Sequence, residues 1–302
     1  MEHASCPVCN QPSPLLFGRE ALSIWYCEAC CLGFQWPAAK TVYETNYRPD
    51  IPPHEEIYYK KPRTRIAFAK DVIGDGAGRK VLDIGCAAGH NLKVFHDLGF
   101  EMHGIEPEFT FAEAAEKFGV RVFRGYLEDY NLGERFDIIT LFHVFEHINP
   151  PMLAKVSALL KEDGFLVVEV PNLSDTNQHT KTFFCTPHLF YHTIASLVKI
   201  FGKYDFTPVK WRGDKVNLIV FKRGASEAGF AEPHQAKLGS GEPSKSELAD
   251  IPKYRLGQIK GRILLNNIIY NTFMNHELKL WLGGLAHKVL GKKVVHGVLN
   301  KI

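Results

Sequence analysis

Short apolar runs alternate with helix-like patterns over most of the chain, and this alternation limits the fold more than any other feature. Near the end of this pattern, two β runs, 206–212 and 216–222, flank the tripeptide Gly-Asp-Lys and predict a hairpin. Strands that alternate with helices usually form a parallel sheet, because each crossover helix returns the chain to begin the next strand in the same direction. The sequence therefore predicts an α/β fold, a mostly parallel sheet with helices on both faces and a C-terminal antiparallel pair. The expected strands are 80–85, 101–105, 121–123, 136–142, 165–170, 206–212 and 216–222, and the expected helices are 63–72, 89–98, 107–118, 151–161 and 188–202.

Four of the seven cysteines form two Cys-x-x-Cys pairs near the N-terminus. In a reducing compartment, such pairs suit a tetrahedral zinc thiolate site better than disulfides. We expect a ribbon-like zinc module over 1–40, in which the metal supports a segment too short for a core of its own. Cys31 is an alternative ligand, whereas Cys86 and Cys185 are expected to be unpaired and buried. The expected zinc ligands are Cys6, Cys9, Cys27 and Cys30.

Composition divides the rest of the chain into four segments. A Pro- and Tyr-rich connector (41–62) precedes the sheet domain (63–223), and residues 224–251 are poor in large apolar side chains, which predicts a flexible linker. The tail (252–302) is apolar, helical in texture and basic. Its nine Lys or Arg and single acid give it +8, so with a net charge of +3 the rest of the chain carries −5.

The tail predicts either a helical pair, packed on the body or on a second subunit of a homodimer, or a basic amphipathic helix at a membrane surface. The chain has no run of eighteen apolar residues, and its N-terminus lacks the apolar core of a signal peptide. We therefore expect a cytoplasmic protein, which would lie at the inner face of the membrane if the tail binds lipid.

The stretch KVLDIGCAAGH joins the first strand of the sheet to a helix through a turn of small residues. The dinucleotide fingerprint G-x-G-x-x-G fails because its sixth position is His90. Small residues let the backbone approach a ligand, and Glu106 ends the next strand, where its carboxylate would accept both hydroxyls of a ribose. An acidic pocket without a phosphate-binding cation favours S-adenosylmethionine (SAM). The turn itself follows the pattern acid-x-Gly-x-small-x-Gly at Asp83, Gly85, Ala87 and Gly89.

Residues 60–222 resemble the class I SAM-dependent methyltransferases. The ordered matches are VLDIGCAAG, GIEPE, GYLEDY, FDIITLFHVFEHI, LLKEDGFLVVEVPN and HLFYHT. With the cysteine pairs, the chain resembles a bacterial subgroup with an N-terminal zinc module, whose members often modify sugars of surface glycans or secondary metabolites. Ala87 departs from the usual second glycine. The resemblance implies a Rossmann-like fold in which Gly85 and Gly89 line the methionine part, Glu106 binds ribose, Tyr126 and Leu127 cover adenine, and Phe142 and His143 lie beside the sulfonium.

Methyl transfer to a hydroxyl needs a base for the hydroxyl proton. The segment FHVFEHI ends the fourth strand, at the catalytic edge of such sheets. His147 is the first choice for the base, with Glu146 to orient it, and His143 is the second. The Glu-His pair equally suits a loop-stabilising role. A rival interpretation comes from the ubiquinone-pathway O-methyltransferases, whose Glu-x-x-Glu-His segment is implicated in binding a divalent cation, although here His143 replaces the first Glu.

The segment TFFCTPHLFYHT lies where an acceptor would bind. One of its two histidines, His188 or His192, is expected to face the cleft while the other packs or caps a helix. His188 and Tyr191 are the candidate catalytic groups. Asn172 either contacts the acceptor or ends the preceding strand.

We expect a SAM-dependent O-methyltransferase acting on a sugar hydroxyl in polysaccharide or secondary-metabolite biosynthesis. C-methylation of a keto sugar, RNA methylation and a SAM-binding scaffold without turnover remain open. RNA is disfavoured as a partner because residues 1–40 carry few cations, Arg19 and Lys40. The intact turn and Glu106 argue against a dead pocket.

Overall fold

The computed structural model describes five stretches of the 302-residue chain: 3–19, 22–38, 59–131, 133–175 and 183–224. Nearly all of the expected connector, all but the first residue of the expected linker and the whole basic tail therefore lie outside the described residues. Within the described stretches, no helix combines the length and the apolar character that a membrane span needs.

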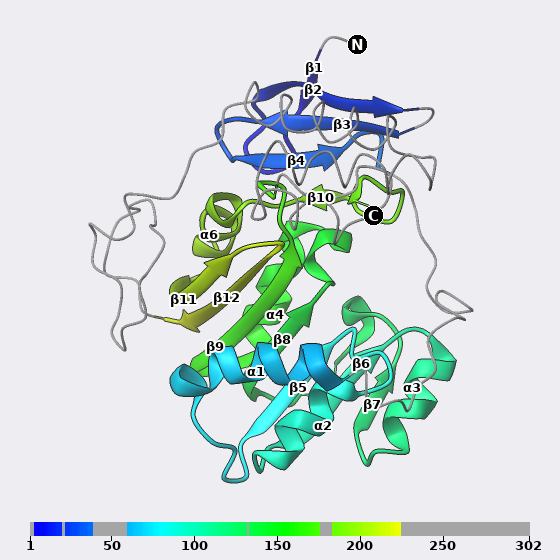
Figure 1. Ribbon diagram of the computed structural model, residues 1–302, viewed down its shortest axis with the longest axis vertical. Helices are drawn as coiled ribbons and strands as arrows, with labels where there is room; N and C mark the ends of the chain where they lie inside the picture. The colour runs from blue at the N-terminus through cyan, green and yellow to red at the C-terminus, as the bar shows by residue number, and fades with distance from the viewer. Residues whose placement is uncertain (1–2, 20–21, 39–58, 132, 176–182, 225–302) are drawn as a thin grey trace, which may run out of the picture.

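A seven-stranded sheet forms the centre of the molecule (Figure 1), in the order β11-β12-β9-β8-β5-β6-β7. The strands from β9 to β7 pair in parallel, and β12 pairs antiparallel with both β9 and β11. This arrangement confirms the predicted Rossmann-like fold with its C-terminal hairpin. The strands are β5 (Lys80–Ile84), β6 (Glu101–Glu106), β7 (Arg121–Arg124), β8 (Phe136–Phe142), β9 (Leu160–Pro171), β11 (Phe206–Gly213) and β12 (Val216–Arg223).

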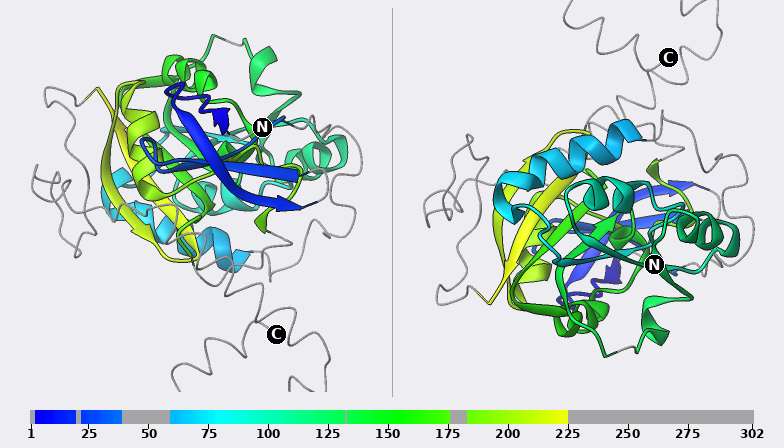
Figure 2. Two further views of the ribbon diagram at one scale, coloured as in Figure 1. Left: turned by 90° about the horizontal axis from the view of Figure 1, so that it is seen from above. Right: turned by 90° about the horizontal axis from the view of Figure 1, so that it is seen from below.

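Helices cover both faces of this sheet, because successive side chains of a strand point to opposite faces. Val81 of β5 packs in the core that contains the apolar residues of α1 and α2, whereas its neighbour Leu82 packs in the core that contains those of α4 and α6. Figure 2 (right) shows α1 along one side of the strands. The helices are α1 (Lys60–Ile73), α2 (His90–Asp97), α3 (Phe109–Glu116), α4 (Leu153–Leu159) and α6 (Ile194–Gly202).

The cysteine-containing segment forms a second, antiparallel sheet that lies across one end of the molecule (Figures 1 and 2). Its own strands are followed at the edge by β10 (Phe190–Tyr191), which belongs to the sheet domain and pairs with β4 through Phe190 with Phe34 and Tyr191 with Gly33. The N-terminal segment therefore shares a sheet with the loop before α6. Its strands are β1 (His3–Ser5), β2 (Pro12–Arg19), β3 (Leu22–Cys27) and β4 (Leu32–Gln35).

The prediction of one helix over 188–202 is wrong over its first part. β10 occupies part of that range, and α6 begins only at Ile194, where Thr193 and Ser196 form a reciprocal capping box. The pairing of β10 with β4 supplies its backbone hydrogen-bond partners from a distant part of the sequence, which local periodicity does not reveal. The other predicted elements are present, with bounds that shift by a few residues apart from an earlier start of β9.

Candidate functional site

The turn after β5 has the backbone geometry of a ligand loop. Gly85, Ala87 and Gly89 all have positive φ, at 70°, 45° and 81°. A Cβ on Gly85 would lie 2.5 Å from a methyl carbon of Val144, so this position needs glycine. The chain then enters α2, which begins directly after Gly89.

Glu106, at the end of β6, lies against this turn. Its carboxylate accepts hydrogen bonds from the backbone N–H of Ala87 (2.8 Å) and of Glu108 (2.9 Å). Burial raises the pKa of this carboxyl to about 7, although both backbone donors oppose the change. Each oxygen receives one donor and has a second acceptor position, so the group fits the two hydroxyls of a ribose.

Asp83 lies behind the turn, fully buried. It accepts hydrogen bonds from Thr140 Oγ1 on β8 (2.6 Å) and from Asn91 Nδ2 on α2 (3.2 Å). Burial raises the pKa of its carboxyl to about 7 against these two hydrogen bonds. Both carboxylate oxygens of Asp83 thus contact protein groups that connect the turn to β8 and α2. Neither Thr140 nor Asn91 was identified from the sequence.

The other residues expected around the cofactor also follow the carboxyl ends of strands. The N–H of Gly125 donates to the carbonyl of Glu106 (3.1 Å), which places the following Tyr126 and the buried Leu127 next to the ribose-binding candidate. Phe142 ends β8, and the guanidinium of Arg65 lies 5.0 Å from the centre of its ring. The residues predicted to bind the cofactor therefore lie along one edge of the sheet.

His143 follows Phe142 and is held between two carboxylates. Its φ is 58°, its Nε2 lies 3.1 Å from Glu169 Oε1, and its Nδ1 lies 3.4 Å from Glu146 Oε1. Arg65 Nε donates to the same Glu169 oxygen at 2.7 Å. Burial lowers the pKa of His143, but its contacts with Glu146 and Glu169 outweigh burial and raise that pKa to about 9.

Arg65 and Glu169 are site residues that the sequence interpretation missed. The available signal was a single charge, Glu169, within the otherwise apolar run FLVVEVP of β9. A buried carboxylate in such a strand requires a cationic partner, although the sequence does not say which one.

Glu146 and His147, in a 3-10 turn after β8 (Phe145–His147), meet His188 from the loop before β10. One ligand atom from each residue lies within 4.8 Å of the other two. The backbone N–H of Leu189 donates to the carbonyl of Glu146 (2.9 Å) and fixes one loop against the other. We refer to Glu146, His147 and His188 as the Glu-His-His cluster. It adjoins His143 and so lies next to the cofactor edge.

Two other polar residues of the acceptor segment, Tyr191 and His192, pack inside the protein. The Tyr191 hydroxyl donates to the carbonyl of Cys185 (3.2 Å), and its ring is buried against Phe183 and Phe184. His192 is fully buried and stacks on Phe145, and burial lowers its pKa to about 4. Of the two histidines, His188 therefore faces the cluster and His192 packs.

Asn172 ends β9 as a turn residue. Its side chain donates to the carbonyl of Asp214 (2.8 Å) and accepts from the N–H of Ser174 (2.9 Å). These two backbone contacts give the amide group a structural role in the strand end.

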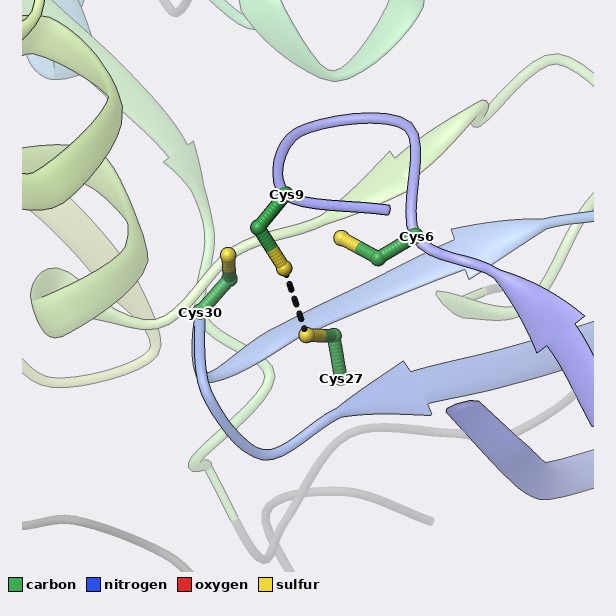
Figure 3. Close-up of side chains that lie close together, drawn as sticks. All are labelled: Cys6, Cys9, Cys27 and Cys30. Carbon is green, nitrogen blue, oxygen red and sulfur yellow. Dashed lines mark hydrogen bonds between the residues drawn. The ribbon is translucent and has the colours of Figure 1, made fainter. Parts of the chain in front are cut away.

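The four predicted zinc ligands come together at the two turns of the N-terminal sheet, and Figure 3 shows their sulfur atoms directed toward one another. All four atoms lie within 4.8 Å of one another, with 3.5 Å between the sulfurs of Cys9 and Cys27. Hydrogen bonds from Cys30 and Cys6 lower the pKa of Cys27, whereas the pKa values of Cys6 and Cys30 are raised. Four sulfur atoms that converge in this way fit a tetrahedral metal ion. Cys31 lies outside the group: its φ is 52° and its thiol contacts the carbonyl of Glu28.

Among the described residues, neither Cys86 nor Cys185 forms a disulfide. Cys86 is fully buried, as expected, and Cys185 is partly exposed.

Comparisons with known proteins support the predicted methyltransferase family. A family of methyltransferase domains matches residues 54–210. The ubiquinone biosynthesis O-methyltransferase of Rhodopseudomonas palustris (strain BisB5) is 34% identical over 104 residues, which cover 32% of this chain and 41% of the relative. The enzyme of the same name from Bradyrhizobium sp. (strain ORS 278) is 30% identical over 118 residues, which cover 35% of this chain and 44% of the relative. The chain thus spans less than half the length of each of these relatives.

Solved structures align with low sequence identity. The PH0226 protein of Pyrococcus horikoshii has a TM-score of 0.46 at 18% identity and covers 59% of this chain and 98% of its own. Magnesium protoporphyrin IX methyltransferase of Synechocystis PCC 6803, with bound SAH, has a TM-score of 0.45 at 15% identity. The alignment covers 55% of this chain and 83% of that structure's chain. The family match spans more than half of the 302 residues, including the turn after β5 and the end of β8. The chain therefore belongs to the family of methyltransferase domains.

Proposed function

We propose that this protein methylates a hydroxyl oxygen of a small-molecule acceptor, with the Glu-His-His cluster removing the hydroxyl proton. The observation that carries the proposal is the position of this cluster beside His143, at the sheet edge where the cofactor residues meet. Bound SAM supplies a methyl group on a cationic sulfur. The acceptor oxygen attacks the methyl carbon in line with the carbon–sulfur bond. The chain must therefore hold the acceptor oxygen and take up its proton.

Hydrogen bonding separates the histidines into two roles. Both ring nitrogens of His143 face carboxylates, so this residue is a donor and a positive charge rather than a proton acceptor. In His147 and His188, Nδ1 lies within hydrogen-bond distance of a backbone carbonyl oxygen, at 2.8 and 3.0 Å. A carbonyl accepts only, so in each neutral ring Nδ1 carries the hydrogen and Nε2 the lone pair. His147 remains the preferred base, ahead of His143.

Two acceptor classes follow from different observations. The names of the curated relatives support transfer to oxygen and suggest a hydroxyl on a ubiquinone precursor. The converging cysteines support the resemblance to zinc-containing methyltransferases of sugars, and so favour a sugar hydroxyl. We keep the sugar hydroxyl as the first proposal and the ubiquinone precursor as the second. We also propose that Cys6, Cys9, Cys27 and Cys30 bind structural zinc.

Methyl transfer with labelled SAM would separate these proposals. The full-length protein would be incubated with SAM that carries a ¹³C-methyl group. Nucleotide-linked sugars would be the acceptors in one set of reactions, and ubiquinone precursors in a second set. We expect a product whose methyl carbon has the NMR shift of an O–CH₃ group, and its loss in His147→Asn. A C–CH₃ product would contradict O-methylation, and turnover of ubiquinone precursors alone would replace the sugar by the second acceptor class.

A further inference from the structure

We propose that Glu146, His147 and His188 bind one divalent transition-metal ion, in a site separate from the four cysteines. One carboxylate and two imidazoles form a donor set that holds such ions and leaves further coordination positions open. Ligand atoms about 2 Å from one ion lie up to about 4 Å apart. The three ligand atoms lie within 4.8 Å of one another, so small side-chain adjustments suffice to meet a common ion.

Glu146 gives an independent indication that a cation binds here. Its side chain is only 2% exposed, and neither carboxylate oxygen has a hydrogen-bond partner among the described residues. A carboxylate removed from water without donors is strongly unfavourable, and buried charges in proteins are usually paired or coordinate metals. The nearest cationic group, His143, lies 3.4 Å from Oε1 but sits closer to Glu169, at 3.1 Å. A metal ion would neutralise the charge of the Glu146 carboxylate, which His143 neutralises only in part because it also contacts Glu169.

The two histidines already have the arrangement that metal ligands need. The Nδ1 of His147 contacts the carbonyl of Pro187, and that of His188 contacts the carbonyl of Phe183. These contacts assign the lone pair to Nε2 in both rings and fix the ring orientations. A backbone carbonyl that accepts from the other ring nitrogen typically orients a metal-bound histidine. The ring centres lie 5.0 Å apart, and Nε2 of His147 is 3.9 Å from Glu146 Oε1.

His143 is not a member of this ligand set. Its two nitrogens face Glu146 and Glu169, and the latter is in turn bound by Arg65. The third ligand comes instead from His188, forty-one positions beyond His147 in the chain. A metal here would therefore join the turn after β8 to the loop before β10, which carries the acceptor candidates.

The catalytic use of this metal rests on the proposed function, whereas its binding does not. A hydroxyl oxygen that occupies an open position on the ion loses its proton to solvent more readily, because the cation stabilises the oxyanion. The oxygen then forms a bond to the methyl carbon while the carbon–sulfur bond breaks, and its electron pair goes to sulfur. When Nε2 of His147 binds the ion its lone pair is no longer available as a base, so in the metal-bound protein solvent takes up the hydroxyl proton in place of His147.

Metal content in the absence of SAM tests the site directly. The full-length wild-type protein, Glu146→Gln and His188→Gln would be dialysed to equilibrium against the same buffered free Zn²⁺ concentration and analysed for bound zinc. His96→Gln is the matched control, because His96 is an exposed histidine on α2 outside the cluster. We expect wild type and His96→Gln to hold one more zinc ion per chain than the two cluster variants, whatever the cysteines bind.

Thermal unfolding provides a second readout that does not depend on counting ions. An ion that binds only the folded state raises Tm. Zn²⁺ should therefore raise the Tm of wild type and His96→Gln more than that of Glu146→Gln, whose shape-conserving change removes only the ligand charge. Equal zinc content and equal Tm shifts in wild type and Glu146→Gln would overturn the metal site. A protein that holds the extra ion yet methylates no hydroxyl would support the site and count against the proposed function alone.

Discussion

At the scale of single residues, two buried carboxyls beside the turn after β5 are expected to make stability depend on pH. Burial raises the pKa values of Asp83 and Glu106 to about 7, from ordinary values of 3.8 and 4.5. Between about pH 4 and pH 7 the unfolded chain has therefore lost protons that the folded protein keeps. The contribution of these groups to the free energy of unfolding falls as pH rises through this window and levels off above it.

The variant Asp83→Asn should lose part of this pH dependence, because an amide does not titrate. A pKa raised from 3.8 to about 7 corresponds to at most about 4 kcal/mol between the two limits. Urea unfolding at pH 5 and pH 8 would measure the fall in free energy of unfolding, which should be smaller in Asp83→Asn than in wild type. Asp71→Asn, an exposed substitution on α1, is the control. Identical pH dependence in all three proteins would refute the buried-charge explanation.

The residues that sequence analysis found differ physically from those it missed. Asp83, Gly85 and Glu106 stand in local patterns, because a strand that enters a ligand turn imposes its own residue types. Arg65 and Glu169 meet only after the chain folds, since α1 and β9 contribute one partner each. No local pattern identifies such a pair, so Glu169, the second carboxylate beside His143, became visible only in the structure.

At the scale of elements, the junction of β10 and α6 shows how tertiary pairing overrides a helical pattern. Thr193 caps α6 through the N–H of Ser196 (3.1 Å), and its hydroxyl donates to the carbonyl of Cys31 (2.9 Å). One side chain thus caps the start of α6 and also binds it to the cysteine turn. The sequence indicated the amphipathic helix but not its first residue, because the strand partner lies in β4.

Removing the hydroxyl in Thr193→Val should destabilise the protein by about 1–2 kcal/mol, the usual cost of losing an N-cap together with a buried hydrogen bond. Urea unfolding at neutral pH would measure the change. Thr64→Val removes a hydroxyl that contacts the backbone of α1 at an exposed position, and it should change stability much less. Equal stability of Thr193→Val and wild type would mean that the cap does not hold the junction.

At the scale of the whole molecule, the cysteine segment packs closely against the methyltransferase domain. Lys199 of α6 and Lys203, which follows the helix as its C-cap, donate to the carbonyls of Ala29 (2.6 Å) and Val8 (3.0 Å), one in each cysteine turn. The N–H of Gln35 on β4 donates to the carbonyl of Leu189 (2.9 Å), directly beside His188. A metal that orders the cysteine turns would therefore also order the loop of the Glu-His-His cluster.

Two neighbouring cysteines allow a matched test of this coupling. Cys30→Ser should lose zinc from the cysteine site, whereas Cys31→Ser should keep it, because Cys31 lies outside the converging group. Hydrogen exchange should accelerate over 186–193 in Cys30→Ser and remain unchanged in β5. Zinc loss without faster exchange in 186–193 would show that the cysteine segment does not support the acceptor loop.

If the turn after β5 and Glu106 together bind SAM, calorimetric titration with SAM will show it. Wild type should bind saturably. Glu106→Gln should bind about 10- to 100-fold more weakly, since it loses charge-assisted hydrogen bonds to the ribose. Glu116→Gln, which removes an exposed carboxylate on α3, should bind like wild type. Undiminished SAM affinity in a folded Glu106→Gln protein would contradict the assignment of this edge of the sheet as the cofactor site.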